Sequence, residues 1–365
     1  MSKGRLIIVQ PALPIYREDF FERLHAFYGS RFLLFYSDDD LGDISSVKSY
    51  SWKINLGRIS SFRNLLFWQN GVLGIQLDSH DCVVLSGAPR FLSTLCFIVK
   101  CRLLRVDVIW WGHYWSSTSK SWRYAVRMLL LRACNGLLFY TDQEIAEYRS
   151  SRFFDSKIYV DALNNGLNVD RIGLLRKNYA ADTRLSRILY IGRLTGKASL
   201  ELLLTALASL RASDVMLDII GSGPEEASLK LFAEECGISN RITWHGGISD
   251  EHRISEVANR CRLFVYPGAV GLSLIHAMAY GLPSIVHNDR WSHMPEFAAF
   301  TDGETGRNFL KGDSVSLANA LDLLIHNSVE LNRFSNISLN RVSKSYNTRK
   351  MADRMFAFLR RFGFH

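Results

Sequence analysis

The stretch YPGAVGLSLIHAMAYGLPSIV, residues 266–286, contains the end of a buried strand, a glycine-bearing loop, a short helix and a second buried strand. Residues 272–280 contain no helix breaker, and Gly281 is a typical C-terminal stop. The helix N-terminus is therefore expected just after Gly271, where free backbone N–H groups and the helix dipole favour an anion. Two interpretations remain open: an anion site with Ser273 as an extra donor, or an ordinary βαβ crossover.

The same alternation of strand and helix runs through all 365 residues. Eleven apolar runs are predicted as strands, at 5–9, 31–36, 81–87, 106–112, 135–141, 157–166, 187–194, 215–223, 242–246, 263–268 and 283–289. Helix-like stretches separate them, which indicates an α/β protein with parallel sheets covered on both faces. Because the chain is too long for one hydrophobic core, we expect two doubly wound, Rossmann-like domains.

Four segments follow from this pattern. Residues 1–172 are predicted as a first domain, and the polar, basic stretch 173–186 as a linker. Residues 187–340 are predicted as a second domain, and 341–365 contain an amphipathic helix expected to pack back on the first domain. Ligands of such domains bind at the carboxyl ends of the strands, so the candidate site residues are sought there.

Composition restricts the class of protein. Charged residues make up 22% and hydrophobic residues 48%, as in a folded globular protein. The six cysteines form no C-x-x-C pair and no Cys/His cluster, so reduced thiols and no metal site are expected. No apolar run is long enough to span a membrane, and the first residues lack the apolar core of a signal peptide. These features predict a cytoplasmic protein.

The net charge of +9 is concentrated in one place. Residues 90–132 contain eight Lys or Arg and one acid, Asp107, interleaved with Trp, Leu and Phe. This mixture suits the surface of an anionic membrane, although two amphipathic helices with solvated basic faces would give the same pattern. No nucleic-acid-binding motif is found, so nucleic acid is not an expected partner.

Two strand ends of the second half carry candidate binding residues. Gly192 ends a strand, and Arg193 and Lys197 follow it in a loop that precedes a helix. Two cations at a strand's carboxyl end suit a pyrophosphate, with a solvated loop as the alternative. Gly221 and Gly223 follow the next strand but lack the full G-x-G-x-x-G spacing, so they indicate a tight turn lining the same edge.

The first half supplies a second group of candidates. His113 stands at a strand end within WWGHYW, where a histidine can donate to a phosphate or a sugar hydroxyl, or serve structure alone. The segment LPIYREDFF brings Tyr16, Arg17, Glu18 and Asp19 to the same edge. Either acid could accept a hydroxyl proton or cap the following helix.

Taken together, these motifs resemble the retaining nucleotide-sugar glycosyltransferases of family 4, whose GT-B architecture has two facing Rossmann-like domains. The order and spacing match over about residues 187–330, through GRL…GK…LLLTAL, LDIIGSGPE, ITWHGGIS, LFVYPG…GLSLIHAMAYGLPSIV and PEFAAFTDGETGRNF. LPIYREDFFERL, WWGHYW and NNGLNVD are similar, more loosely, to acceptor-domain segments of enzymes that build bacterial surface polysaccharides.

The resemblance assigns roles to these residues. It implies that Arg193 and Lys197 neutralise the donor diphosphate and that His113 lies near the transferred sugar, which makes these three the expected catalytic residues. The expected donor-binding residues are Gly192, Gly221, Gly223, Gly271, Leu272, Ser273, His276 and Glu296. The expected acceptor-side residues are Tyr16, Arg17, Glu18 and Asp19.

The sequence departs from the family at its E-x(7)-E motif, whose two positions fall on Gly268 and His276. In the family the first acid meets sugar hydroxyls and the second meets the nucleotide ribose. His276 can still bond a ribose hydroxyl through a ring nitrogen. Gly268 leaves sugar recognition to backbone groups or to side chains such as Asn288, Asp289 and Glu296.

The implied function is transfer of a sugar, with retention, from a UDP- or GDP-sugar co-substrate to a glycan or polyprenyl-diphosphate-linked acceptor, with no metal or other cofactor. The resemblance suggests lipopolysaccharide O-antigen, capsule or exopolysaccharide synthesis at the inner face of the cytoplasmic membrane. Two alternatives stay open. One is a nucleotide-sugar epimerase or hydrolase of the same fold, and the other is an inactive nucleotide-sugar-binding partner of another transferase.

Overall fold

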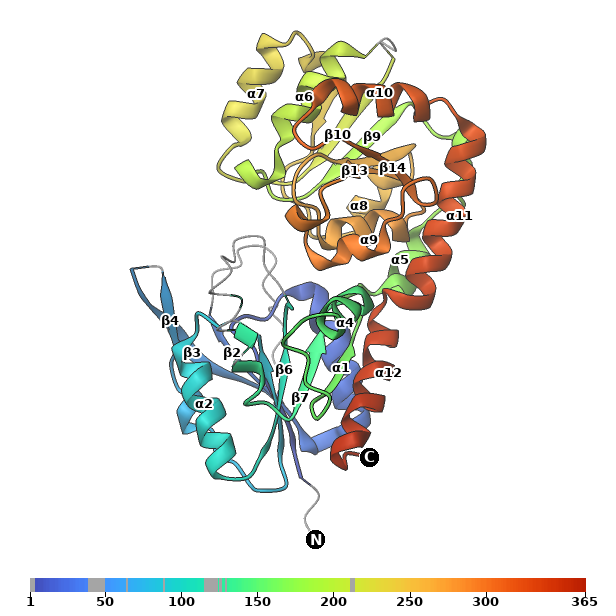
Figure 1. Cartoon of the computed structure of the whole chain (residues 1–365). Coiled ribbons are helices and arrows are strands. Elements are labelled where there is room, and N and C mark those ends of the chain that lie inside the picture. The colour runs from blue at the N-terminus through green and yellow to red at the C-terminus, as the bar shows by residue number, and fades with distance from the viewer. Residues whose placement is uncertain are drawn as a thin grey trace. The chain divides into compact units, whose positions relative to one another are not determined.

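The computed structural model describes residues 4–38, 50–63, 65–87, 89–114, 124, 127, 128, 130–210 and 214–365. The chain forms two compact units, the first made of Met1–Asn165 and Thr348–His365 and the second of Gly166–Asn347 (Figure 1). Each unit is a sheet with helices on its faces, which confirms the predicted α/β class. No helix among the described residues is long and apolar enough to cross a membrane.

The first unit is built on a sheet of order β4-β3-β2-β1-β5-β6-β7-β8. All neighbouring strands run parallel except β3 and β4, which form an antiparallel hairpin. The strands are β1 (Leu6–Val9), β2 (Phe32–Asp38), β3 (Lys53–Phe62), β4 (Leu66–Gln69), β5 (Cys82–Ser86), β6 (Asp107–Trp111), β7 (Gly136–Phe139) and β8 (Tyr159–Ala162).

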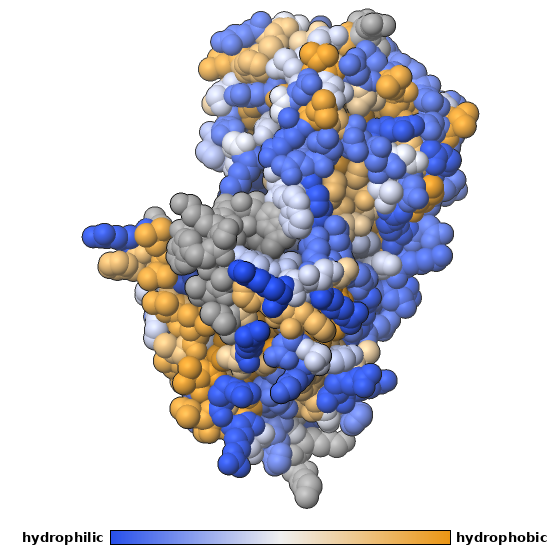
Figure 2. All heavy atoms as spheres, in the orientation of Figure 1, coloured by the Kyte–Doolittle hydropathy of each residue, from blue (hydrophilic) through white to orange (hydrophobic). Residues whose placement is uncertain are grey.

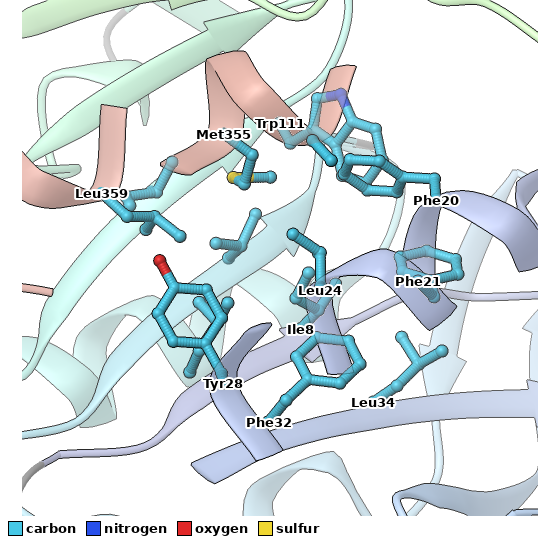
Figure 3. Packing of buried hydrophobic residues seen from close by; sticks show 14 of the residues in the cluster. Ile8, Phe20, Phe21, Leu24, Tyr28, Phe32, Leu34, Trp111, Met355 and Leu359 are labelled. Carbon is cyan, nitrogen blue, oxygen red and sulfur yellow. The ribbon is translucent and has the colours of Figure 1, made fainter. Parts of the chain in front are cut away.

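Helices cover both faces of this sheet, because its strands are apolar on both sides. On one face α1 (Glu18–Tyr28) and α12 (Thr348–Leu359) lie side by side, and Phe20, Trp111 and Met355 pack together in the core between them and the strands (Figure 3). On the other face α2 (Leu92–Leu103) and α4 (Asp142–Arg149) bury residues such as Phe97 and Tyr148.

The second unit has an entirely parallel sheet of order β11-β10-β9-β12-β13-β14. Its strands are β9 (Arg187–Ile191), β10 (Met216–Ile220), β11 (Ile242–Trp244), β12 (Leu263–Tyr266), β13 (Ser284–His287) and β14 (Gly306–Phe309). Its helices are α5 (Val169–Leu175), α6 (Leu200–Ser209), α7 (Glu226–Glu235), α8 (Glu251–Ala258), α9 (Leu272–Ala279), α10 (Ser314–Leu324) and α11 (Ser328–Ser345). The strand order reverses between β9 and β12, which is where such sheets bind ligands.

All eleven predicted strands are present, whereas β3, β4 and β14 were not predicted. The domain boundary also differs, since the first unit ends at Asn165 rather than at residue 172. The segment 341–365 is divided, because residues up to 347 belong to the second unit and those from 348 pack on the first.

The predicted linker 173–186 is instead part of the second unit. Its first residues complete α5, and the Tyr179 hydroxyl donates to the Arg262 carbonyl at 2.6 Å. Arg184 is buried, and its Nη1 donates to the carbonyls of Ala258 (3.0 Å) and Cys261 (2.9 Å). The polar side chains that made this stretch resemble a linker serve to satisfy backbone carbonyls of the second unit.

Candidate functional site

The loops that follow neighbouring strands of the second unit are hydrogen-bonded to one another. The Leu194 N–H, after β9, donates to the Ser222 carbonyl, after β10, at 2.9 Å. The Gly221 N–H in turn donates to the Gly246 carbonyl, after β11, at 2.8 Å. These bonds hold three loops side by side at the carboxyl edge of the sheet.

The predicted glycines of this edge let the loops approach so closely. A Cβ on Gly221 would lie 1.9 Å from the Gly192 carbonyl oxygen, and a Cβ on Gly223 would lie 2.2 Å from the Leu194 carbonyl oxygen. A Cβ on Gly192 would lie 2.8 Å from the Tyr266 ring. Gly221 and Gly223 therefore allow backbone contacts that a larger residue would prevent, and Gly192 leaves room for the Tyr266 ring.

The loop that carries Arg193 and Lys197 touches the loop in front of α9. The Ala269 N–H donates to the Lys197 carbonyl at 3.0 Å, and a Cβ on Gly268 would lie 2.1 Å from that carbonyl oxygen. The two cationic side chains are exposed, and within the described part of the chain neither forms an ion pair. This backbone contact brings the loop that carries the two cations next to the loop that leads into α9.

The N-terminus of α9 is open at this site. Gly271 occupies the N-cap position and no side chain caps the helix, so the first-turn amides of Leu272 and Ser273 lack an intrahelical acceptor. Glu296 is buried next to it, and a Cβ on Gly271 would lie 3.7 Å from the Glu296 Oε2 and 3.2 Å from the Met294 side chain. The free backbone amides of the first turn and the dipole of α9 both favour an anion at this position.

His276, on α9, is paired with a carboxylate that the sequence analysis did not single out. Its Nε2 lies 2.8 Å from the Glu251 Oε1, which also accepts the Tyr280 hydroxyl at 2.6 Å. Burial alone would raise the pKa of Glu251, but the charge and hydrogen bond of His276 and the Tyr280 hydroxyl together lower it. With Nε2 bonded to this carboxylate, the other ring nitrogen of His276, Nδ1, is left for a hydrogen bond to a ligand.

A stacked pair of histidines supports the loop in front of α9 through a hydrogen bond to its backbone. The rings of His287 and His293 lie 3.7 Å apart, and the Val270 N–H donates to the His293 Nδ1 at 3.2 Å. Burial lowers the pKa of His287 to about 4 and that of His293 to about 3, so both are neutral. Nearby, Asp289 pairs with Lys311 at 2.8 Å instead of being free to meet a ligand.

In the first unit, Arg17 and His113 lie on a pair of aromatic rings. The Arg17 guanidinium is 4.5 Å from the Trp111 ring and 5.6 Å from the Tyr140 ring, and the His113 ring meets Tyr140 at 4.4 Å. Burial, with Arg127 and Arg17 nearby, lowers the pKa of His113 to about 3. Trp111 is itself buried in the core, so what this place can offer a sugar or an anionic group is the half-buried Tyr140 ring, the Arg17 guanidinium and the neutral imidazole.

Two of the expected acceptor-side residues are engaged in packing. Glu18 is buried and pairs with the Lys53 Nζ at 3.0 Å, while Asp19 bonds Arg23 (2.8 Å) and the Thr348 hydroxyl. These carboxylates hold α1 to the sheet and to α12, so the geometry does not offer either as a proton acceptor. Tyr16 is half-buried, with its ring 6.0 Å from the Arg17 guanidinium.

The fold is shared with solved glycosyltransferase structures. Sucrose-phosphate synthase from Thermosynechococcus elongatus superposes with a TM-score of 0.72 at 18% identity, covering 99% of both chains. Anabaena Alr3699/HepE in complex with UDP gives 0.71 at 14% identity, covering 98% of this chain and 100% of that one. The two units therefore form a GT-B fold, which confirms the predicted fold class.

Residues 173–341 match the family described as "Glycosyl transferases group 1". This match covers most of the second unit and agrees there with the resemblance seen in the sequence. The chain is 29% identical over 168 residues to the GDP-mannose-dependent alpha-(1-6)-phosphatidylinositol monomannoside mannosyltransferase of Mycobacterium tuberculosis, covering 40% of this chain and 43% of that protein. The chain thus spans less than half the length of the mycobacterial relatives it matches.

Proposed function

We propose that this protein is a hexosyltransferase that moves a sugar from a nucleoside diphosphate donor to an acceptor, with retention at the anomeric carbon. The observation that carries the proposal is the contact between the Arg193–Lys197 loop and the loop in front of α9. Through it, the loop with two cations that form no ion pair within the described part of the chain lies next to the loop leading to the amides of Leu272 and Ser273. An anion with several oxygens, such as a diphosphate, suits this arrangement.

The chemistry follows from that charge distribution. Departure of the nucleoside diphosphate builds negative charge on its bridging oxygen, and Arg193, Lys197 and the α9 amides stabilise it. The acceptor hydroxyl attacks from the face that the leaving group vacates and passes its proton to a donor phosphate oxygen. Only the nucleotide sugar is needed as co-substrate. The name of the mycobacterial relative supports GDP-mannose as the first donor to test, and UDP-sugars as the second.

The acceptor proposed is a lipid-linked glycan, in lipopolysaccharide O-antigen, capsule or exopolysaccharide synthesis at the inner face of the cytoplasmic membrane. The half-buried Tyr140 ring supports a sugar, and the Arg17 guanidinium, which lies over the Trp111 and Tyr140 rings, supports a charged linkage. His113 is proposed to donate a hydrogen bond to the transferred sugar. Its low pKa keeps the ring neutral, and a neutral imidazole still has one N–H group to donate.

A second candidate function is a nucleotide-sugar-binding partner without turnover. It is favoured by the absence of both motif carboxylates, since Gly268 and His276 stand in their places. The Glu251 carboxylate behind His276 argues for the active enzyme, because it restores negative charge near the second position. Turnover separates the two candidates.

The test begins with thermal stability in the presence of UDP and GDP, followed by their sugar conjugates. Ligand at 100 times its dissociation constant adds about 2.7 kcal/mol to the free energy of unfolding. We expect one diphosphate to stabilise the protein selectively and Arg193→Ala to abolish that effect. The exposed Arg253, on α8 of the same unit, provides the control variant Arg253→Ala, which removes one charge elsewhere.

With a donor identified, transfer to sugar and lipid-linked acceptors is measured by product analysis. Arg193→Ala should lower kcat roughly 100- to 1,000-fold, as does loss of one donor to a developing oxyanion, while Arg253→Ala keeps the rate. Donor binding without any product supports the binding partner instead. Equal rates for the two variants would exclude Arg193 from leaving-group stabilisation.

A further inference from the structure

Helix α2 is apolar on the side that the fold leaves exposed. Leu92, Cys96, Val99 and Leu103 follow one another at spacings of four, three and four, which places them on one face of the helix. Val99 is 58% and Leu103 79% exposed. The opposite face, with residues such as Phe97, is buried against the sheet, so packing within the first unit explains only half of this helix.

The β3–β4 hairpin continues this surface. At its end Phe62 is 66% and Leu65 63% exposed, and Trp68 on β4 is 38% exposed. The Phe67 and Phe91 rings stack at 5.3 Å between the hairpin and the start of α2. Orange side chains accordingly gather on the side of the first unit where α2 and the hairpin lie (Figure 2).

The charged residues within the two segments that carry these apolar side chains are all cations. Residues 50–77 and 89–106 contain no Asp or Glu. Apart from the buried Lys53, they contain six cations: Arg58, Arg63, Arg90, Lys100, Arg102 and Arg105. All five arginines are exposed. Arg63 and Arg90 lie over the rings of Phe62 and Phe67, at 5.6 and 4.8 Å. We call this surface, made of the exposed residues of 58–68 and 90–105, the α2–hairpin face.

We propose that the α2–hairpin face binds the surface of an anionic lipid bilayer. Exposed apolar side chains flanked by arginines bury in the acyl boundary while the guanidinium groups meet lipid phosphates. A second copy of the chain is a poorer occupant, because a two-fold contact through this face would bring the arginines of the two copies together. The proposal extends the proposed function by naming the partner of the first unit, and part of the basic segment 90–132 lies in it. Lys120 and Arg123 of that segment lie outside the described residues.

The experiment is flotation of the whole chain with vesicles of phosphatidylcholine alone and of phosphatidylcholine mixed with phosphatidylglycerol, which have the negative surface of an anionic leaflet. We expect binding to the anionic vesicles that weakens as salt rises. The double variant Arg102→Gln/Arg105→Gln should lower the partition coefficient about fivefold per arginine. Val99→Ser/Leu103→Ser should lower it roughly tenfold or more.

Leu323 and Val329 provide the matched control, because they are 77% and 80% exposed on α10 and α11 of the second unit. Leu323→Ser/Val329→Ser should float like the unchanged protein. Equal losses in the two serine variants, or equal binding to both kinds of vesicle, would overturn the proposal. So would a wild-type dimer in solution that Val99→Ser/Leu103→Ser converts to a monomer without any vesicle binding. No nucleotide or acceptor is present, so this test fails or succeeds separately from the proposed transferase activity.

Discussion

Gly268 stands where the family's first motif acid would be, and the structure gives a physical reason for its identity. A Cβ at this position would lie 2.1 Å from the Lys197 carbonyl oxygen and 2.6 Å from the Ala198 carbonyl carbon. Both are backbone atoms that cannot rotate away. The loop that contains Gly268 and the loop that contains Lys197 therefore lie too close together for any side chain at position 268, which explains why the family's carboxylate is missing here.

We expect Gly268→Ala to destabilise the second unit by about 1–3 kcal/mol, as overpacking does, and to weaken donor binding because the Arg193–Lys197 loop must move. Gly268→Glu, which restores the family residue, should be worse and should not raise activity. The measurements are urea unfolding and donor titration. The control is Gly173→Ala on α5, where a Cβ meets nothing within 4 Å and stability should hold or rise. A more active Gly268→Glu would contradict this account.

The sequence showed that both motif carboxylates are absent, but it did not show which other residues lie near the two motif positions. Glu251 pairs with His276 although it lies 25 positions earlier and begins a different helix. Nothing in the local pattern of either residue indicates the other. The contact depends on how α8 and α9 pack, which a single sequence does not reveal.

Among the elements, the loop in front of α9 depends on a neutral histidine pair. Each N–H donated to a histidine Nδ1, such as that of Val270 to His293, requires that nitrogen to be unprotonated. The pKa values of His287 and His293, about 4 and about 3, lie below the ordinary value of 6.5. The unfolded chain therefore takes up protons at a higher pH than the folded chain does.

We expect stability to be independent of these histidines above pH 6.5 and to fall as the pH drops from there toward about 4. Each group contributes a loss of up to about 1.4 kcal/mol per pH unit. Urea unfolding at pH 7, 6 and 5 measures the slope. His293→Gln should lower stability at pH 7 and flatten the slope by about one proton, whereas His252→Gln, at an exposed histidine of α8, should leave both unchanged. A slope identical in all three proteins would rule this mechanism out.

The strands that the sequence missed differ from the others in polarity or burial. β14 (GRNF) is short and polar, and β3 (KINLGRISSF) is polar and exposed along much of its length. Neither strand has the buried apolar run by which the eleven other strands were predicted. In β3 and β4 the apolar residues that do occur are largely exposed, at the α2–hairpin face.

For the whole molecule, the first unit is assembled from two distant parts of the chain. Met351, Met355, Phe358 and Leu359 of α12 are buried in the same core as Phe20 of α1 (Figure 3). The second unit, by contrast, is one continuous segment, Gly166–Asn347. The sequence placed the boundary a few residues late, because α5 is short and the polar residues after it looked like a linker.

We expect a fragment of residues 166–347 to fold by itself and a fragment of residues 1–165 to remain unfolded, because only the latter loses part of its core. In the full chain, Met355→Ala should destabilise the first unit by about 2–5 kcal/mol. Arg349→Ala, at an exposed position of the same helix, should change stability by less than about 0.5 kcal/mol. Circular dichroism of the fragments and urea unfolding of the variants test this. Cooperative unfolding of the 1–165 fragment would contradict it.

Because α12 packs on the first unit, the two units are expected to complete their folding in a particular order during synthesis. Protein domains usually fold from the N-terminus as the ribosome releases them. Here the first unit begins synthesis but cannot close until residues 348–365 emerge, after the whole second unit has been made. The later-made unit is thus free to fold first, and the unfinished core of the earlier one stays exposed throughout translation. Nascent chains of this protein should therefore need the protection of chaperones until residues 348–365 have left the ribosome.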